Sequence, residues 1–255
     1  MNQKITVTII TLNEEEFIKD CIESAWKIAD EIIVVDSHST DKTREIAESL
    51  GARVYEHSYM GDGLQKDYGV QFAKNDWILH MDADERLDEQ MAAEIQGINY
   101  AETTYDAYAF RRKNHIGTRW QKVWYPDYMV RLYHRNRCRF SPIIVHTSLT
   151  TKNYKRMQGH IIHYSFKDLS DCFIRADKYS KLDAKILFDN NRKVNAWDPA
   201  VHGIVSFIKF FFLKQGFIYG LDGLTASLIG ALRSYLKYAH VIEMHQNAVL
   251  ANPDS

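Results

Sequence analysis

Short apolar runs alternate with one-sided apolar segments along the first hundred residues. Four runs are rich in β-branched and bulky apolar side chains, which is typical of buried strands: residues 5–10, 31–36, 53–56 and 77–82. Between them, apolar residues recur on one helical face near residues 14–26, 41–50 and 64–74. This alternation predicts an α/β fold with a mostly parallel central sheet and helices on both of its faces.

The pattern changes twice in the rest of the chain. Residues 105–112 alternate like a half-exposed strand, and residues 161–165 form another apolar run, which contains His163. From residue 168 the pattern is helical, and a last helix is predicted at about 224–250. Residues 201–213 are strongly apolar, but the run is shorter than the ~20 residues that a membrane-spanning helix needs.

Polar side chains follow three of the predicted strands at the point where each strand ends. Ligands of parallel sheets bind at the carboxyl ends of the strands, so we expect these side chains to line one crevice. They are Thr11, Asn13 and Glu14 after the first strand, Asp36 and Ser37 after the second, and Asp82 and Asp84 after the fourth.

The aspartates at these strand ends have two interpretations. Asp82 and Asp84 are one residue apart, so in an extended strand they face the same side, where they can hold a divalent cation. Alternatively, Asp84 and Glu85 only cap the next helix. Asp36 can accept a hydrogen bond from a ribose hydroxyl or a uracil imide, or it caps the helix that starts near Ser39.

Composition excludes some functional classes. A formal net charge of −1 gives no global field typical of a nucleic-acid binder. Neither GxGxxG nor GxxxxGK[ST] occurs, which disfavours a dinucleotide fold and a P-loop. Cys21, Cys138 and Cys172 lack metal-binding spacing and indicate reduced thiols, and no signal-peptide pattern opens the chain. These features predict a cytoplasmic protein.

Three motifs together resemble a known enzyme family. They are Thr-Leu-Asn-Glu-Glu at 11–15, Val-Val-Asp-Ser-His-Ser-Thr-Asp-Lys-Thr at 34–43 and Met-Asp-Ala-Asp-Glu at 81–85. Their order and spacing resemble the inverting family-2 glycosyltransferases (GT2), which have the GT-A nucleotide-sugar-binding fold. Later segments resemble, more narrowly, the lipopolysaccharide inner-core β-1,4-glucosyltransferases that act on heptose.

The resemblance implies a division of the chain and roles for the strand-end residues. Residues 1–165 would form the catalytic domain, with a nucleotide-sugar-binding half at 1–97 and an acceptor-binding half at 98–165, and residues 166–255 would form a helical C-terminal extension. The implied nucleotide-sugar-binding residues are Thr11, Asn13, Glu14, Asp36, Lys66 and Asp82. Asp82 and Asp84 would be the family's DxD pair, with Asp84 the more direct ligand of Mg²⁺ or Mn²⁺. For Lys66, a solvated helix lysine is the alternative.

An aromatic and basic segment at 113–124 is the expected acceptor region. Aromatic faces pack on sugar rings, and arginine binds phosphate or carboxylate through two hydrogen bonds. An acceptor that is both sugar and anion would suit Arg112, Trp120, Trp124 and Arg131. The alternative is a solvated basic loop over a structural tryptophan.

Inverting sugar transfer also needs a base that removes the proton of the acceptor hydroxyl. Asp127, which follows Pro126, is the first candidate, although an acid beside proline is also typical of a turn. His146 is the second candidate, because Thr147 stands where relatives commonly have an acid. The third alternative is an acid at another position of the chain. His163 can be a third metal ligand, an acceptor contact or a structural residue.

The resemblance implies a metal-assisted enzyme that moves a hexose, with glucose expected, from a UDP-sugar to the heptose of a lipopolysaccharide or lipooligosaccharide core. A sugar-nucleotide nucleotidyltransferase is one alternative, but the acidic loop at 14–16 lacks the basic, glycine-rich character that a triphosphate needs. A catalytically inactive nucleotide-sugar-binding protein of the same fold is the other.

The apolar run at 201–213, flanked by Lys214, can lie in a membrane interface. A lipid-linked oligosaccharide acceptor would make that useful, and we therefore expect a cytoplasmic protein that is peripheral on the inner face of the cytoplasmic membrane. The alternatives are a helix packed on the catalytic domain and a homo-oligomer contact.

Overall fold

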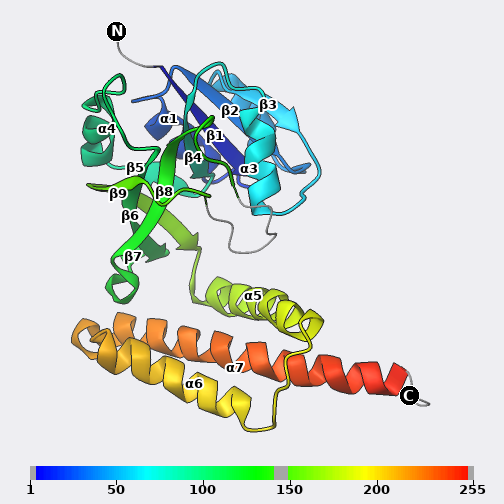
Figure 1. Ribbon diagram of the computed structural model, residues 1–255. Coiled ribbons are helices and arrows are strands. Elements are labelled where there is room, and N and C mark those ends of the chain that lie inside the picture. The colour runs from blue at the N-terminus through cyan, green and yellow to red at the C-terminus, as the bar shows by residue number, and fades with distance from the viewer. Residues whose placement is uncertain (1–3, 141–148, 252–255) are drawn as a thin grey trace. The chain divides into compact units, whose positions relative to one another are not determined.

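The computed structural model describes residues 4–140 and 149–251, and Figure 1 shows the elements that they form. These residues fold into two compact units. The first contains the chain up to residue 113 together with residues 126–163, and the second contains residues 114–125 together with the chain from residue 164 onward. Strands β6 (Ala107–Ile116) and β9 (Tyr154–Phe166) each begin in the first unit and end in the second.

The four strands predicted near the start of the chain are confirmed. They pair in parallel in the order β3-β2-β1-β4 and alternate with three helices along the chain. The elements are β1 (Ile5–Thr11), α1 (Ile18–Ala25), β2 (Glu31–Asp36), α2 (Thr43–Ser49), β3 (Arg53–Glu56), α3 (Asp62–Val70) and β4 (Trp77–Asp82).

Helices cover both faces of this parallel half, as predicted. Successive residues of a strand point to opposite faces, so neighbouring residues of β2 enter different apolar clusters. Val34 shares one cluster with Ile22 of α1 and Ala47 of α2. Val35 belongs to the other cluster and lies against Gly69 of α3, where a Cβ would be only 3.0 Å from the valine side chain. Helices α1 and α2 therefore pack on one face, and α3 packs on the other.

The sheet becomes antiparallel beyond β4. Strand β8 (Asp127–His134) pairs with both β4 and β6, and β9 continues the sheet to β5 (Glu85–Leu87). Three further elements precede α5: helix α4 (Glu89–Gln96) belongs to the first unit, and the two-residue β7 (Arg119–Trp120) and the 3₁₀ helix η1 (Lys122–Trp124) belong to the second. The α/β class is confirmed. The sheet is mixed, because β6 and β8 pair in antiparallel direction and therefore need no helical crossover between them.

A short turn that contains Asp84 connects β4 to β5, whose first residue is Glu85. Helix α4 begins after β5, and its N-cap is Asp88, whose carboxylate accepts a hydrogen bond from the backbone N–H of Met91 at 2.8 Å. The interpretation in which Asp84 and Glu85 cap the next helix is therefore wrong, because a strand separates them from that helix.

The second unit is mainly helical. Its helices are α5 (Leu169–Asp189), α6 (Asp198–Ile208), the π-helical turn η2 (Lys209–Leu213), the 3₁₀ helix η3 (Gly216–Tyr219) and α7 (Gly220–Ala251). Helix α7 packs along α5 and α6, and the hydroxyl of Ser206 donates a hydrogen bond to the carbonyl of Gly230 at 3.0 Å. At the turn between α6 and α7, residue 223 must be glycine, because a Cβ there would overlap the carbonyl oxygen of Gly216.

Within the described residues, no single helix is long and apolar enough to cross a membrane. The segments 198–213 and 216–248 meet the length and hydropathy requirement only as a pair, and that pair is bent by 69°. The apolar run predicted at 201–213 belongs to the first half of this pair.

Candidate active site

The carboxyl ends of β1, β2 and β4 meet at one edge of the sheet. In the parallel register, Thr11 lies opposite Asp36, and Ile10 lies opposite Asp82. The hydroxyl of Thr11 is buried there, and it has no hydrogen-bond partner among the residues that the structure describes. The register therefore brings together the strand-end residues that the sequence singled out.

Asp36 is fully buried and stabilises the turn after β2. Its carboxylate accepts hydrogen bonds from the backbone N–H of Ser39, at 2.8 Å, and from the Ser39 hydroxyl. The Nε atom of Arg44 lies 3.9 Å away. Because α2 begins only at Thr43, Asp36 does not cap a helix that starts near Ser39. That interpretation is corrected to an aspartate that fixes the turn before the helix.

Asn13 joins this turn to the loop after β1. Its φ of 54° lies in the left-handed region, which asparagine adopts more readily than most residues. Its Oδ1 accepts a hydrogen bond from the backbone N–H of Thr40, and its own N–H donates to the Ser39 hydroxyl, both at 2.8 Å. The backbone N–H of Glu14 donates to the hydroxyl of Thr43, also at 2.8 Å. The two loops are thus held in one arrangement.

Three nitrogen groups surround the carboxylate of Asp82. The Nζ of Lys66 lies 3.5 Å from Oδ1, the Nε2 of His80 lies 3.2 Å from Oδ1, and a guanidinium nitrogen of Arg131 donates to Oδ2 at 2.9 Å. Burial alone would raise the pKa of Asp82, but the charges of Lys66 and Arg131 outweigh it and hold that pKa well below its usual range. Asp82 is therefore a fixed negative charge.

His80 is a neutral member of this group. Burial, aided by the charge of Lys66, lowers the pKa of His80 to about 3. A carboxylate can only accept hydrogen bonds, so the proton of the neutral ring must lie on Nε2, facing Asp82. The Nδ1 atom then accepts from the hydroxyl of Thr8 at 3.2 Å. The sequence signal for this residue is a histidine inside an otherwise apolar strand.

Arg131 is shared by two acids. Its guanidinium contacts both Asp82 and Glu85, and the Glu85 carboxylate also accepts the backbone N–H of Asp82 at 3.1 Å. Glu85 is fully buried, and Arg131 is 3 % exposed. Burial would lower the pKa of Arg131, but the charges of Glu85 and Asp82 raise it instead. The sequence suggested Arg131 as an acceptor contact; in the structure it holds the turn between β4 and β5 in place.

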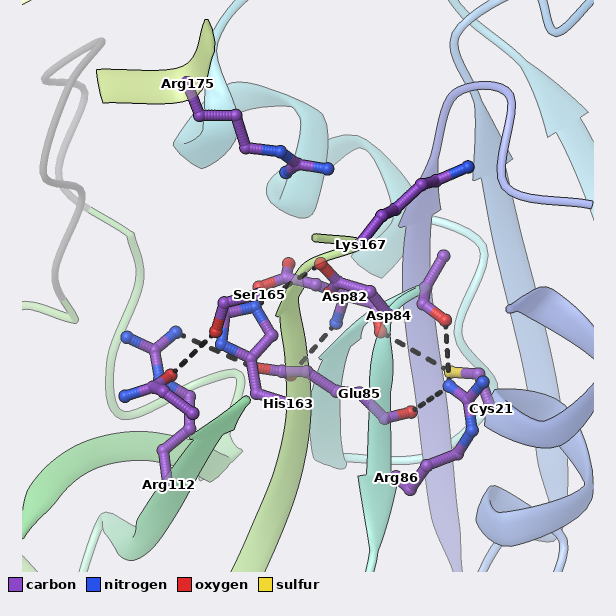
Figure 2. A network of polar contacts seen from close by, with 12 residues as sticks. Cys21, Asp82, Asp84, Glu85, Arg86, Arg112, His163, Ser165, Lys167 and Arg175 are labelled. Atoms are coloured by element: carbon purple, nitrogen blue, oxygen red, sulfur yellow. Dashed lines mark hydrogen bonds and ion pairs between the residues drawn. The ribbon is translucent and has the colours of Figure 1, made fainter. Parts of the chain in front are cut away.

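Asp84 faces His163 of β9. The His163 Nε2 atom lies 3.4 Å from the Asp84 carboxylate, and both side chains are partly buried (Figure 2). Strand β5, which follows Asp84, pairs with β9 so that Glu85 lies opposite His163. Of the three predicted metal ligands, the structure therefore brings Asp84 and His163 together, whereas Asp82 is engaged by cations.

No group of three His, Cys, Asp or Glu side chains in metal-binding geometry occurs among the described residues. The pair Asp84 and His163 nevertheless fits the ligand types of Mg²⁺ or Mn²⁺, provided that the remaining ligands come from outside the chain. Mg²⁺ in nucleotide sites is commonly bound by one or two carboxylates plus phosphate oxygens, and Mn²⁺ also accepts imidazole.

Asp127 and Arg112 form a close ion pair across β6 and β8. The Nε and a terminal nitrogen of Arg112 lie 2.9 and 2.8 Å from the Asp127 carboxylate, and the two residues are partners in the β6–β8 register. Another guanidinium nitrogen of Arg112 lies 3.9 Å from Glu85 (Figure 2). The predicted base and one predicted acceptor residue therefore contact each other.

The remaining predicted acceptor-side and base candidates are Trp120, Trp124 and His146. Trp120 and Trp124 belong to the second unit, where the Trp124 ring lies 5.9 Å from that of Phe166. His146 and Thr147 lie outside the described residues.

Comparison with known proteins places this architecture in a class. A solved glucosyl-3-phosphoglycerate synthase from Mycobacterium tuberculosis, in complex with Mn²⁺, UDP and glucosyl-3-phosphoglycerate, superposes with a TM-score of 0.50 at 17% identity, over 72% of this chain and 79% of that one. The predicted GT-A fold is thereby confirmed. Residues 6–166 match the model of Glycosyl transferase family 2, and the chain belongs to that family.

Two relatives in sequence extend this result. An uncharacterized glycosyltransferase from Rickettsia bellii is 34% identical over 96% of this chain and 88% of its own length. The lipopolysaccharide core biosynthesis glycosyltransferase LpsC from Rhizobium meliloti is 26% identical over 98% of this chain and 95% of its own length.

Proposed function

We propose that this glycosyltransferase moves glucose from UDP-glucose to a heptose of a lipopolysaccharide or lipooligosaccharide core, with inversion at the anomeric carbon and with the help of Mg²⁺ or Mn²⁺. The observation that carries the proposal is the meeting of Thr11, Asp36 and Asp82 at one sheet edge in a member of this family. The similarity to LpsC supports a core acceptor, and the UDP and Mn²⁺ of the glucosyl-3-phosphoglycerate synthase support the donor and the metal.

The donor nucleotide would bind at the ends of β1 and β2. A carboxylate has about four acceptor positions, and Ser39 uses two of those of Asp36. Because Asp36 is fully buried, the turn at Ser39 would have to open for a uracil imide or ribose hydroxyl to donate to it. The buried Thr11 hydroxyl offers a further hydrogen bond. Asn13 and Glu14 would shape the base pocket through the loops that they fix.

The diphosphate would lie beside Lys66 and Asp84. Lys66 supplies positive charge next to Asp82, and the pair Asp84 and His163 would hold the divalent cation. When bound, such a cation neutralises the charge that develops on the departing UDP. Arg131 keeps Asp82 and the β4–β5 turn in place during the reaction.

Asp127 is proposed as the base that removes the proton of the acceptor hydroxyl, and His146 is the second candidate. The Arg112 guanidinium contacts the Asp127 carboxylate and would hold it in one orientation. Asp127 would remove the acceptor hydroxyl proton while that oxygen attacks the anomeric carbon. Trp120 and Trp124 are proposed to contact the acceptor sugars.

We also propose that residues 1–165 carry catalysis, with the donor half at 1–97 and the acceptor half at 98–165, and that residues 166–255 are an extension. The enzyme would act at the inner face of the cytoplasmic membrane on a lipid-linked oligosaccharide. A homo-oligomer is the alternative use of the extension.

Release of UDP from UDP-glucose by the purified protein, with Mn²⁺ and a heptose-terminated core acceptor, tests the proposal. Asp84→Asn should lower the rate by roughly 100-fold or more, because replacing a charged ligand by a neutral amide should cost at least as much as the loss of an outer-shell partner. Asp189→Asn, a surface change in α5, should leave the rate unchanged. Turnover without a divalent cation, unaffected by Asp84→Asn, would contradict the metal assignment.

The two rival functions give different products. A nucleotidyltransferase would release pyrophosphate from UTP and a sugar 1-phosphate. An inactive binding protein would bind UDP-glucose in calorimetry and release no UDP with any core acceptor. Replacing UDP-glucose by other UDP-, GDP- and dTDP-sugars in the same assay would identify the donor.

A further inference from the structure

Helix α6 and the turn η2 carry an apolar stripe on their outward side. The exposed residues of the stripe are Val201, Ile204, Val205, Ile208 and Phe212. Their spacing of three or four residues puts them on one helical face. The opposite face of α6 packs on α7, where Gly203 lies against Tyr235 and Ser206 bonds to Gly230. The stripe is therefore outside the packing of the second unit.

The stripe continues around the turn between α6 and α7. Leu213 and Ile218 are 76% and 61% exposed, and Phe217 and Leu221 are also exposed. We call residues 208–221 the helical tip. Large exposed apolar surfaces are rare on soluble proteins unless they bind something. We therefore expect the tip to bind a partner surface.

The charges of the tip point to the kind of occupant. Lys209 and Lys214 are the only charged residues between Asp198 and Asp222, and both are exposed. Their ammonium groups lie 5.9 and 5.4 Å from the centre of the Phe210 ring. Asp222 is paired with Arg119 at 2.9 Å, also within the second unit. The tip thus combines exposed apolar side chains with two lysines that make no ion pair with a carboxylate among the described residues.

We propose that the helical tip docks on a bilayer that contains anionic phospholipid. The apolar side chains would enter the boundary between headgroups and acyl chains, and the two lysines would contact lipid phosphates. One-sided exposure fits a helix that lies in the interface, since the other side of α6 is packed on α7. The further claim that this surface brings the enzyme to a lipid-linked acceptor rests on the proposed function.

A second copy of the chain suits the tip less well. Contact of two tips would bring four lysines together, and the tip contributes no carboxylate to compensate them. Like charges facing each other across an interface oppose association. Anionic lipid supplies the missing negative charge.

Flotation of the purified full-length chain with vesicles tests the docking surface. The chain should float with vesicles of phosphatidylcholine and phosphatidylglycerol, bind phosphatidylcholine alone much more weakly, and lose binding as salt is raised. The double variant Leu213→Gln/Ile218→Gln should remain in the soluble fraction. The matched control Ile174→Gln/Leu182→Gln changes two exposed apolar residues of α5 and should float like the parent.

A charge variant separates the lysines from the apolar residues. Lys209→Gln/Lys214→Gln should weaken binding to the anionic vesicles by about 25-fold, which corresponds to about 1 kcal/mol per lysine near the surface. The control Lys178→Gln/Lys193→Gln changes two exposed lysines elsewhere in the second unit. It should have little effect on binding to the anionic vesicles.

Two outcomes would overturn the proposal. One is a folded parent chain that ignores anionic vesicles. The other is a concentration-dependent dimer, seen by light scattering, that Leu213→Gln/Ile218→Gln dissociates, which would assign the tip to a second copy. UDP release with a soluble acceptor, measured on the same samples, separates failure of docking from failure of the proposed transferase.

Discussion

Single residues in the candidate site owe their properties to neighbours of opposite charge. Asp82 and Glu85 share Arg131, and Asp127 is paired with Arg112. The sequence could predict Asp82, because an acid at a strand end is visible in the pattern. It could not predict the partner Arg131, which is 49 positions away, because strand direction and register are not encoded in apolar alternation. Arg131 was therefore considered only as an acceptor contact.

Arg131→Met should lower the free energy of unfolding by about 3–5 kcal/mol, because it removes the closest cation from the buried carboxylate of Glu85. Lys27→Met breaks the exposed pair with Glu89 and should cost less than about 1 kcal/mol. Urea denaturation measures both. Similar small losses in the two variants would show that the Arg131 pair does not support the fold.

The cysteine thiols should be unreactive in the folded chain. All three are buried, and burial raises the pKa of Cys172 from 9.0 to about 11. The unfolded thiol ionises first, so the contribution of Cys172 to stability is present below pH 9 and is lost as the pH rises toward 11. A thiol reagent at pH 8 should label the native chain slowly and the urea-unfolded chain at three sites. Fast native labelling would contradict the burial.

At the scale of elements, close backbone approaches decide which substitutions the sheet accepts. Strand β9 passes α4 at Gly159, where a Cβ would lie 2.4 Å from the Cα of Met91. The backbone N–H of Gly159 also donates to the Glu94 carboxylate at 2.9 Å. The sequence predicted strands and helices from their periodicity, but nothing in it indicated that this glycine is a packing contact between elements far apart in the chain.

Gly159→Ala should destabilise the protein by about 1–3 kcal/mol, because β9 and α4 must move apart to admit the methyl group. Gly203→Ala in α6 is the control. Its Cβ would meet the Tyr235 Cβ at 3.4 Å, an ordinary contact, and alanine favours the helix. The control should therefore change stability by less than about 1 kcal/mol in either direction, as measured by urea denaturation.

At the scale of the whole molecule, the α/β class and the meeting of Thr11, Asp36 and Asp82 at one sheet edge were predictable, because both follow from the order of elements. The antiparallel strands beyond β4 were not, since residues 107–134 give strands without specifying their partners. The sequence pattern also could not predict that residues 114–125 belong to the second unit, because this depends on tertiary packing.

Binding of UDP with Mn²⁺ should stabilise the folded chain by mass action. At a UDP concentration of about 100 times Kd the gain is about 2.7 kcal/mol, which raises the melting temperature of a chain of this size by roughly 5–10 °C. Asp36→Ala should abolish the shift with UDP, and GDP should produce a smaller shift in the parent. Equal shifts with both nucleotides would contradict a uridine-selective pocket.

The arrangement of ion pairs around the β4–β5 turn also has a thermodynamic consequence. Lys66, Arg112 and Arg131 balance Asp82, Glu85 and Asp127, whereas Asp84 faces an imidazole. A diphosphate arriving alone would therefore meet a site whose remaining charge is negative, and a divalent cation arriving alone would lack most of its ligands. Each should tighten the binding of the other by the same factor, as reciprocity between linked equilibria requires.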